Sequence, residues 1–271
     1  MTPDACHKFH DAVTQLRRFF LDHGFVEVHP QSQLSILAAC EDPATIATFE
    51  YNGQIWPLPQ TGQMHLEHYL LKNPDMPGFF CVTTSYRQEP NPMPGRHETI
   101  FPMFEFELPG GIEDLLALEE DLCYALGFEE DPEFIFYDWA THLFGVKELT
   151  AEHEEKLFQQ NGPVVFLEKF PLRTSPFRNM AVSGNHARKV DVLLYGMETI
   201  GSAERSTDKD QMREHFYTIS NGAYAETLFA KFGRERVEAE LNEFLSMDFF
   251  QRSGGGIGMT RLLRALDLQG K

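Results

Sequence analysis

The sequence predicts an α+β fold in which an antiparallel β-sheet is flanked by helices. Two stretches, Phe79–Tyr86 and Ile100–Leu108, are rich in aromatic and β-branched residues and enclose a polar loop, which is the pattern of two antiparallel strands. Apolar residues at helical spacing open the chain, and a second amphipathic helix follows the second strand. With 271 residues, the chain is of a size for a single domain, 1–271, with a full core.

The first element is a predicted helix that Thr2 caps and Gly24 ends. A short strand, Phe25–Val28, follows it and runs into Pro30. The apolar residues of the helix recur at helical spacing and are Phe9, Val13, Leu16 and Phe20.

A hairpin is expected over Thr45–Trp56, because Asn52-Gly53 supplies the positive φ angles of a tight turn. The segment Leu58–Glu67 then turns into a helix that continues through Leu71. Glutamines at such a corner suit an ammonium or carboxamide ligand, although a plain surface position explains them too.

The loop between the two central strands carries charged and ionisable side chains close to the strand ends. They are Arg87, Glu89, Arg96 and His97. Three prolines and a glycine in this loop exclude ladder pairing. Two guanidinium groups on one surface repel each other unless an anion lies between them, and a polyphosphate suits their forked donors. The alternative is a surface hairpin with solvated charges.

The helix predicted over Ile112–Leu126 has acidic residues in its first turn. The acids further along it, Glu119, Glu120 and Asp121, are interpreted as a solvated face. Residues 131–162 are predicted to contribute no site residue. Three histidines, His142, His153 and His186, are too scattered to be interpreted as metal ligands.

Two further strands are predicted, over Val164–Phe170 and Val190–Tyr195. The loop Thr174–Arg188 between them is interpreted either as a mobile lid or as irregular surface. Residues 207–247 follow a helical pattern with two successive amphipathic segments.

Near the C-terminus, the glycine-rich run Ser253–Leu262 is predicted to be a strand that opens into a helix. Glycine allows another group to approach the backbone closely, and a helix N-terminus next to Arg261 favours an anion. A glycine-rich loop alone is a weak signal.

Composition excludes several classes of protein. The formal charge of −18 makes the chain as a whole unfavourable for nucleic acid, whose non-specific binding depends on Lys and Arg. No apolar run is long enough to span a membrane, and the N-terminus is polar, so we expect a cytoplasmic protein without a signal peptide. The four cysteines are widely spaced and are expected to be reduced and buried: Cys6, Cys40, Cys81 and Cys123.

Together these motifs resemble the signature motifs of class II aminoacyl-tRNA synthetases. Tyr86–Glu89 with Arg96-His97 and Phe101 is similar to the second class motif, and Gly254–Arg261 is similar to the third. The run Asp191–Arg205 has the spacing of acid, acid and arginine found in the asparaginyl, aspartyl and lysyl subgroup. The resemblance covers almost the whole chain. It implies the class II synthetase-like antiparallel sheet flanked by helices.

The resemblance also implies a role for each motif residue. Arg87 would hold the α-phosphate of ATP and the amino-acid carboxylate, and Phe101 and Arg261 would enclose adenine; Arg87 and Arg261 are the expected catalytic residues. Asp191 and Glu198 would bind Mg²⁺. The full ATP-binding set is Arg87, Glu89, Arg96, His97, Phe101, Glu198, Gly256, Gly258 and Arg261.

The amino-acid side is implied to involve Gln60, Gln63, Leu66 and Arg205. At the position of Leu66, aspartyl enzymes are expected to have a lysine and asparaginyl enzymes a leucine, which favours an Asn-like over an Asp-like substrate. Ile100 and Pro102 depart from the usual Glu and Thr of the subgroup, and the motif loop is one residue longer. These departures leave the identity of the amino acid open.

The implied function is formation of an aminoacyl-adenylate from ATP and an Asn- or Asp-like amino acid, with transfer to an unknown acceptor. The alternatives are an ammonia-dependent asparagine synthetase, which has a similar core, and an inactive paralogue that binds nucleotide and regulates. The first helix and strand with Pro30 resemble the first class motif, so we expect a homodimer, with Phe19, Phe20 and Phe25 as the apolar surface to be covered. Charging of tRNA is doubtful, because the charge is −18 and no segment is assigned to an anticodon-binding domain.

Overall fold

A computed structural model of the chain describes residues 2–30, 34–36, 43–174 and 176–270. Its strands are β1 (Val26–Glu27), β2 (Thr48–Tyr51), β3 (Gln54–Pro57), β4 (Phe79–Tyr86), β5 (Ile100–Pro109), β6 (Glu133–Phe136), β7 (Val164–Pro171), β8 (Val182–Ser183), β9 (His186–Leu194), β10 (Met197–Glu204) and β11 (Arg252–Gly258). Its α-helices are α1 (Pro3–Asp22), α2 (Gln63–Lys72), α3 (Ile112–Ala125), α4 (Tyr137–Phe144), α5 (Ala151–Asn161), α6 (Lys209–Thr218), α7 (Ala223–Phe232), α8 (Arg234–Leu245) and α9 (Met259–Gln269).

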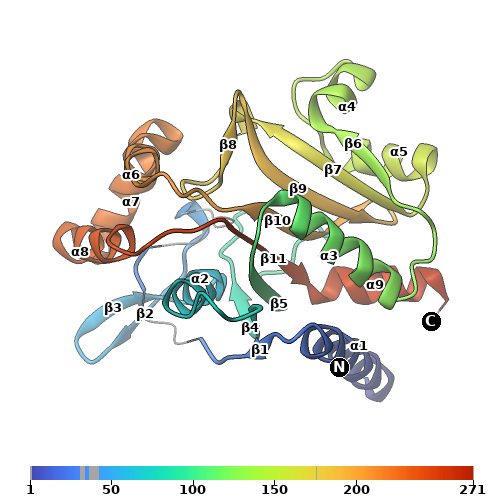
Figure 1. Cartoon of the computed structure of the whole chain (residues 1–271), viewed down its shortest axis with the longest axis horizontal. Helices are drawn as coiled ribbons and strands as arrows, with labels where there is room; N and C mark the ends of the chain where they lie inside the picture. Colours follow the sequence, from blue (N-terminus) through green and yellow to red (C-terminus); the bar gives the residue numbers. More distant parts are fainter. Residues whose placement is uncertain (1, 31–33, 37–42, 175, 271) are drawn as a thin grey trace.

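One large sheet forms the centre of the molecule, with helices on its faces (Figure 1). Its strand order is β1-β4-β5-β11-β10-β9-β7-β6, and β8 pairs with β9. Neighbouring strands are antiparallel except in two pairs, β1 with β4 and β6 with β7. The predicted α+β class and the antiparallel sheet flanked by helices are therefore confirmed.

The central hairpin has the predicted boundaries to within one residue. Tyr86 pairs with Ile100, so the loop 87–99 starts directly where the β4–β5 ladder ends. The β2–β3 hairpin is confirmed as well, with positive φ at Asn52 and Gly53. The glycine-rich run forms β11 and passes straight into α9.

Helices α1, α3 and α9 cover one face of the sheet. Phe20 of α1 lies against Phe104 and Phe106 of β5, at ring-centroid distances of 5.1 and 5.0 Å. Because side chains alternate along a strand, Glu105 and Glu107 point to the opposite face. Both carboxyl groups are nevertheless buried, because α2 packs over that side of β5.

Burial corrects the interpretation of the acids on α3. Glu119 is fully buried, because it lies on the side of the helix that packs on the sheet with Leu115 and Leu122. Glu120 and Asp121 are exposed, as expected. The burial raises the pKa of Glu119 to about 8.

The predicted loop Thr174–Arg188 is only partly a loop. It contains β8 and the beginning of β9, and Arg178 and Asn179 are buried. Asn179 donates to the buried carboxylate of Glu67 at 2.6 Å, so this part is built into the core. The interpretation as a mobile lid or irregular surface is therefore wrong for these residues.

The remaining expectations have mixed outcomes. The helical pattern over 207–247 is confirmed by α6, α7 and α8, which share a core with α2. Cys81 and Cys123 are buried and free, whereas Cys6 is exposed, and Cys40 lies outside the described residues. Within the described ranges, no helix combines the length and the apolar character needed to cross a membrane.

Candidate active site

The two acids of the predicted metal site converge on one point of the sheet. Asp191 is on β9 and Glu198 on β10, and Tyr195 and Gly196 form the turn between them with φ angles of 49° and 73°. An irregularity in the β9–β10 pairing places Gly201, and not Ile200, opposite Asp191. A Cβ atom added to Gly201 would lie 3.0 Å from Glu198 Oε1 and 3.7 Å from Asp191 Oδ1. The missing side chain therefore leaves room at the two carboxylates.

The charges around these acids set their ionisation. Burial raises the pKa of Asp191 to about 7; Lys189, at 2.7 Å from its Oδ2, opposes the rise, and the negative charge of Glu198 adds to it. Burial also pushes the pKa of Glu198 upward, but Lys189 and three arginines outweigh it and hold this pKa below its usual value. Glu198 is thus the more acidic of the pair. Asp191 thus forms an ion pair with Lys189 in addition to its convergence with Glu198.

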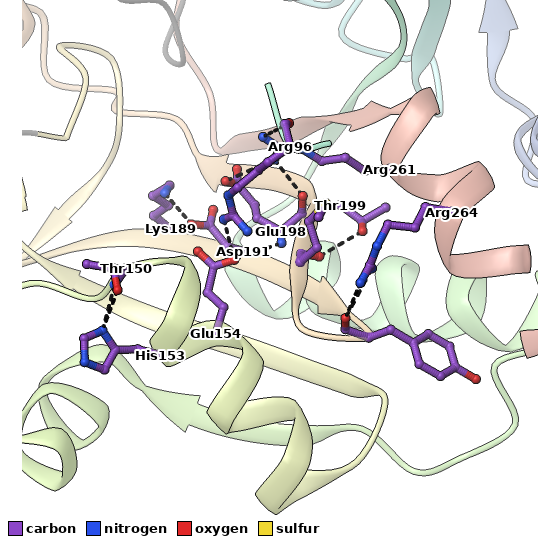
Figure 2. Close-up of polar contacts among 12 residues, drawn as sticks. Arg96, Thr150, His153, Glu154, Lys189, Asp191, Glu198, Thr199, Arg261 and Arg264 are labelled. Atoms are coloured by element: carbon purple, nitrogen blue, oxygen red, sulfur yellow. Dashed lines mark hydrogen bonds and ion pairs between the residues drawn. The ribbon is translucent and has the colours of Figure 1, made fainter. Parts of the chain in front are cut away.

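Three arginines surround Glu198: Arg87, Arg96 and Arg261. Arg261 donates from Nη1 to the backbone oxygen of Glu198 at 2.7 Å, and its Nη2 lies 3.5 Å from the backbone oxygen of Arg96 (Figure 2). The structure therefore brings the predicted cations of the loop 87–99 and of α9 together over the predicted metal ligands.

Two buried nitrogen atoms at this place have no hydrogen-bond partner among the described residues. The buried Nε of Arg87 and Nδ1 of His97 form no hydrogen bond within the described part of the chain. The Arg87 guanidinium stacks on the Phe101 ring at 5.3 Å. Phe101 therefore contacts Arg87 here, and its predicted contact with adenine stays a prediction. Glu89 is half-buried and forms no hydrogen bond or ion pair with described residues.

Sequence reasoning missed Glu154, which lies on α5 in the stretch predicted to hold no site residue. Its Oε2 accepts a hydrogen bond from Arg96 Nη2 at 2.5 Å. Figure 2 shows its side chain pointing from α5 toward Asp191 and Glu198. Nothing in the sequence around an acid on a polar amphipathic helix distinguishes a site residue from a surface residue. Only the packing of α5 against β10 brings Glu154 close to Glu198.

Arg205, Gln63 and Glu107 meet on the same face of the sheet. Arg205 forms an ion pair with Glu107 at 3.2 Å, and Gln63 Nε2 donates to the Glu107 carboxylate. Burial raises the pKa of Glu107 to about 7, although Arg205 opposes the rise. The alternation of apolar and acidic residues along this strand does not indicate that Glu107 is buried against Arg205.

The other two residues predicted to bind the amino-acid substrate contact other parts of the chain. Gln60 is buried and donates to Thr45 Oγ1 at 2.8 Å, and its Oε1 has no partner among the described atoms. Leu66 is fully buried and belongs to a core cluster with Leu70 and Phe79. Its side chain therefore packs in the interior, and its role in amino-acid binding stays a prediction.

Two glycines of β11 are needed because neighbouring strands leave no room for a side chain. A Cβ atom on Gly254 would lie within 1.9 Å of Glu107, and one on Gly255 within 2.5 Å of Ser202. At Gly258 the nearest atom would be 3.7 Å away. The close approach predicted from the glycines is therefore made by neighbouring strands at the first two positions. Gly256 and Gly258 as ATP-binding residues stay predictions.

The residues present fit Mg²⁺ and ATP. Asp191 Oδ1 is buried without a hydrogen-bond partner in the described chain, which is the state of an oxygen that suits a cation. Among the described residues, no three His, Cys, Asp or Glu side chains are placed so that they could hold a metal ion together, but Mg²⁺ on a nucleotide needs only one or two carboxylates in addition to phosphates and water. The positive charges of Arg87, Arg96 and Arg261 are complementary to the negative charge of a triphosphate.

A cavity of about 340 Å³ lies at the far end of β10. Its lining includes Arg205, Glu204 and Arg188, the last two joined by an ion pair of 2.9 Å. Glu204 also accepts from the backbone N–H of Ile112 and from Gln251, so its carboxylate is well satisfied. This polar cavity is separate from the cluster of acids and arginines around Glu198.

Similar solved structures share this fold at low sequence identity. The asparaginyl-tRNA synthetase of Pyrococcus horikoshii with asparaginyl-adenylate is 20% identical with a TM-score of 0.78, covering 96% of this chain and 64% of that one. The Entamoeba histolytica asparaginyl-tRNA synthetase with asparaginyl-adenylate is 20% identical with a TM-score of 0.74, covering 96% and 63%. A putative aspartyl-tRNA synthetase of Leishmania major Friedlin is 15% identical with a TM-score of 0.75, covering 97% and 62%.

The chain thus spans less than two thirds of these proteins. No curated protein matches it. The family model described as tRNA synthetases class II (D, K and N) matches residues 4–268, almost the whole chain. Because this match covers far more than half of the chain, the chain belongs to the class II tRNA synthetase family of the D, K and N type.

Proposed function

We propose that this chain forms an aminoacyl-adenylate from ATP and an asparagine-like amino acid. The observation that carries the proposal is that Arg261 pairs with Glu198 and contacts the backbone of Arg96, while the Glu198 carboxylate converges with that of Asp191. Arg87 and Arg96 add positive charge that lowers the pKa of Glu198. Arginines alone would suit many anions. Arginines together with two converging acids suit an anion that arrives with a divalent cation, and ATP with Mg²⁺ is such a ligand.

The reaction needs no catalytic base. An amino-acid carboxylate, already ionised, forms a bond to the α-phosphorus while the bond from this phosphorus to the bridging oxygen breaks, and pyrophosphate leaves with the electron pair. Arg87 would hold the α-phosphate and the attacking carboxylate, and Arg96 and Arg261 would stabilise charge on the phosphates. Mg²⁺ on Asp191 and Glu198 would neutralise part of that charge. Catalysis is then positioning plus charge stabilisation.

The Arg205–Glu107 pair supports asparagine over aspartate. Arg205 offers donors to a side-chain oxygen, while the Glu107 carboxylate accepts from a side-chain NH₂ group. An aspartate carboxylate would face the negative charge of Glu107 in a buried place. Since the pKa of Glu107 is about 7, this repulsion grows with pH, and the preference for asparagine should be stronger at pH 8 than at pH 6.

Pyrophosphate exchange into ATP, run with each standard amino acid, tests activation. We expect exchange with asparagine, and we expect Arg87→Ala to reduce it by at least 100-fold, because one charged donor at a transition state contributes about 3 kcal/mol. Arg234→Ala is the matched control, since Arg234 lies exposed on α8. Absence of exchange with every amino acid in folded protein would favour the inactive paralogue.

We further propose an acceptor other than tRNA, because a charge of −18 disfavours association with RNA. Ammonium and total tRNA, supplied separately with ATP, Mg²⁺ and the activated amino acid, test this. Efficient acylation of tRNA would contradict the proposal. Asparagine formed from aspartate and ammonium would instead identify the ammonia-dependent ligase, and would also contradict the argument from Glu107.

A further inference from the structure

Glu154 connects the loop 87–99, which carries predicted ATP ligands, to the predicted metal site. Its Oε2 accepts from Arg96 Nη2 at 2.5 Å and from the backbone N–H of Glu198 at 3.3 Å (Figure 2). The side chains of Arg96 and Glu154 are only 12% and 15% exposed, so water screens this ion pair far less than a surface pair. One carboxylate oxygen thus contacts two chain segments that carry predicted ATP ligands.

Arg261 completes this arrangement from the opposite side. It donates to the backbone oxygen of Glu198 at 2.7 Å and lies 3.5 Å from the backbone oxygen of Arg96. Four segments are therefore joined at one place: the loop 87–99, β10, α5 and α9. Glu154 is the member of this group that holds the Arg96 side chain.

The loop 87–99 has no ladder of its own to fix Arg96. It contains three prolines and a glycine, and its ends are joined through Arg87 N–H to the Thr99 oxygen at 2.8 Å. A free arginine side chain loses rotamer freedom when a ligand orders it. Holding Arg96 in place before ATP arrives removes part of that cost. Glu154 uses one N–H group of the guanidinium, and no further hydrogen bond joins the Arg96 side chain to a described residue, so the other N–H groups can serve phosphate oxygens.

The charge of Glu154 argues for a role in the site and against simple packing. Its carboxylate points toward Asp191 and Glu198 (Figure 2), and because like charges repel, a third carboxylate at this place is electrostatically unfavourable by itself. It becomes favourable through Arg96, which it contacts directly. A purely structural anchor for α5 would not require a charge at this position.

We propose that Glu154 is a positioning residue that holds the Arg96 guanidinium above Asp191 and Glu198, oriented for the outer phosphates of ATP. The inference rests on the proposed ATP-dependent function. It assigns a role to α5, which supplies none of the motif residues.

A double-mutant cycle tests this inference through binding. Calorimetric titration with ATP and with AMP, both with Mg²⁺, compares wild type, Glu154→Ala, Arg96→Ala and the double variant. We expect Glu154→Ala to weaken ATP binding about tenfold, equal to about 1.4 kcal/mol. AMP, which lacks the outer phosphates, should bind within about twofold of wild type. In the Arg96→Ala background, Glu154→Ala should have no further effect on ATP.

Two more variants complete the design. Glu152→Ala on the exposed side of the same helix is the matched control and should leave ATP binding unchanged. Glu154→Gln keeps an acceptor for Arg96 and should weaken ATP binding in the same direction but by less, which keeps the test informative if Glu154→Ala does not fold.

The opposite results overturn the inference. Tighter ATP binding by Glu154→Ala would mean that the ion pair restrains Arg96 from ATP. Equal loss of ATP and AMP binding, or the same loss without Arg96, would mean a general structural role. If Arg96→Ala weakens ATP and Glu154→Ala does not, the inference alone fails. If wild type binds no ATP, the proposed function fails with it.

Discussion

At the scale of single residues, the buried Glu119 makes the stability of this protein depend on pH. Burial raises its pKa in the folded state to about 8, whereas an unfolded glutamate ionises near pH 4.5. Between these values the folded state binds more protons than the unfolded state, so stability falls as pH rises. Over the two units from pH 6 to pH 8 this amounts to about 2 kcal/mol.

We therefore expect Glu119→Gln to lose this part of the pH dependence. Urea unfolding at pH 6 and pH 8 should show the variant gaining stability relative to wild type by about 2 kcal/mol between the two pH values. Glu120→Gln makes the same chemical change at the exposed neighbouring position and should follow wild type. Equal pH dependence of wild type and Glu119→Gln would rule out a raised pKa at this site.

At the scale of elements, β11 depends on glycine because its neighbours on both sides occupy the space. A Cβ atom on Gly255 would lie 2.5 Å from the Ser202 Cβ and 2.9 Å from the backbone oxygen of Gly201. We expect Gly255→Ala to destabilise the fold by about 1–3 kcal/mol through overpacking, as measured by denaturant unfolding.

Gly258→Ala is the matched control on the same strand, since its added Cβ would have its nearest contact at 3.7 Å. Unfolding of this variant should differ from wild type by well under 1 kcal/mol. A large loss of stability in Gly258→Ala, or no loss in Gly255→Ala, would mean that the room for a Cβ atom does not determine the need for glycine in this strand.

At the scale of the whole molecule, the reason first given for a homodimer does not hold. Phe19, Phe20 and Phe25 are buried in the chain's own core and need no partner. A different observation now supports a dimer. Strand β1 lies at the end of the sheet with no described strand on its outer side, and Leu21 of α1 and Val26 of β1 are 53% and 39% exposed.

We accordingly propose a dimer through the α1–β1 edge. Sedimentation at micromolar concentration measures its oligomeric state. Leu21→Glu should shift it toward the monomer, because a charge in an apolar interface is unfavourable. Leu143→Glu, at a similarly exposed leucine on α4, should leave the dimer intact. Sedimentation of wild type as a 31 kDa monomer would contradict the proposal.

Much of the fold was predictable because its signals are local. Thr2 caps α1 with Pro3 at the first helical position, and Asn52-Gly53 forms the turn between β2 and β3. Alternation along 100–108 gave the two faces of β5 but not the environment of its acids. Glu105 and Glu107 alternate with apolar residues in the sequence, and that alternation does not show that both are buried.

The amino-acid sequence by itself determined the central hairpin, the helices α1, α2, α3 and α9, the family motifs and the arginines and acids within those motifs, since each of these rests on neighbouring residues or fixed spacing. Only the tertiary structure decided which charges meet. Gly201 lies beside Asp191 because of an irregular pairing, and Glu154 reaches Arg96 from 58 residues away because α5 packs on β10. Burial, pairing partners and pKa depend on what surrounds a side chain in space, which spacing along the chain does not encode.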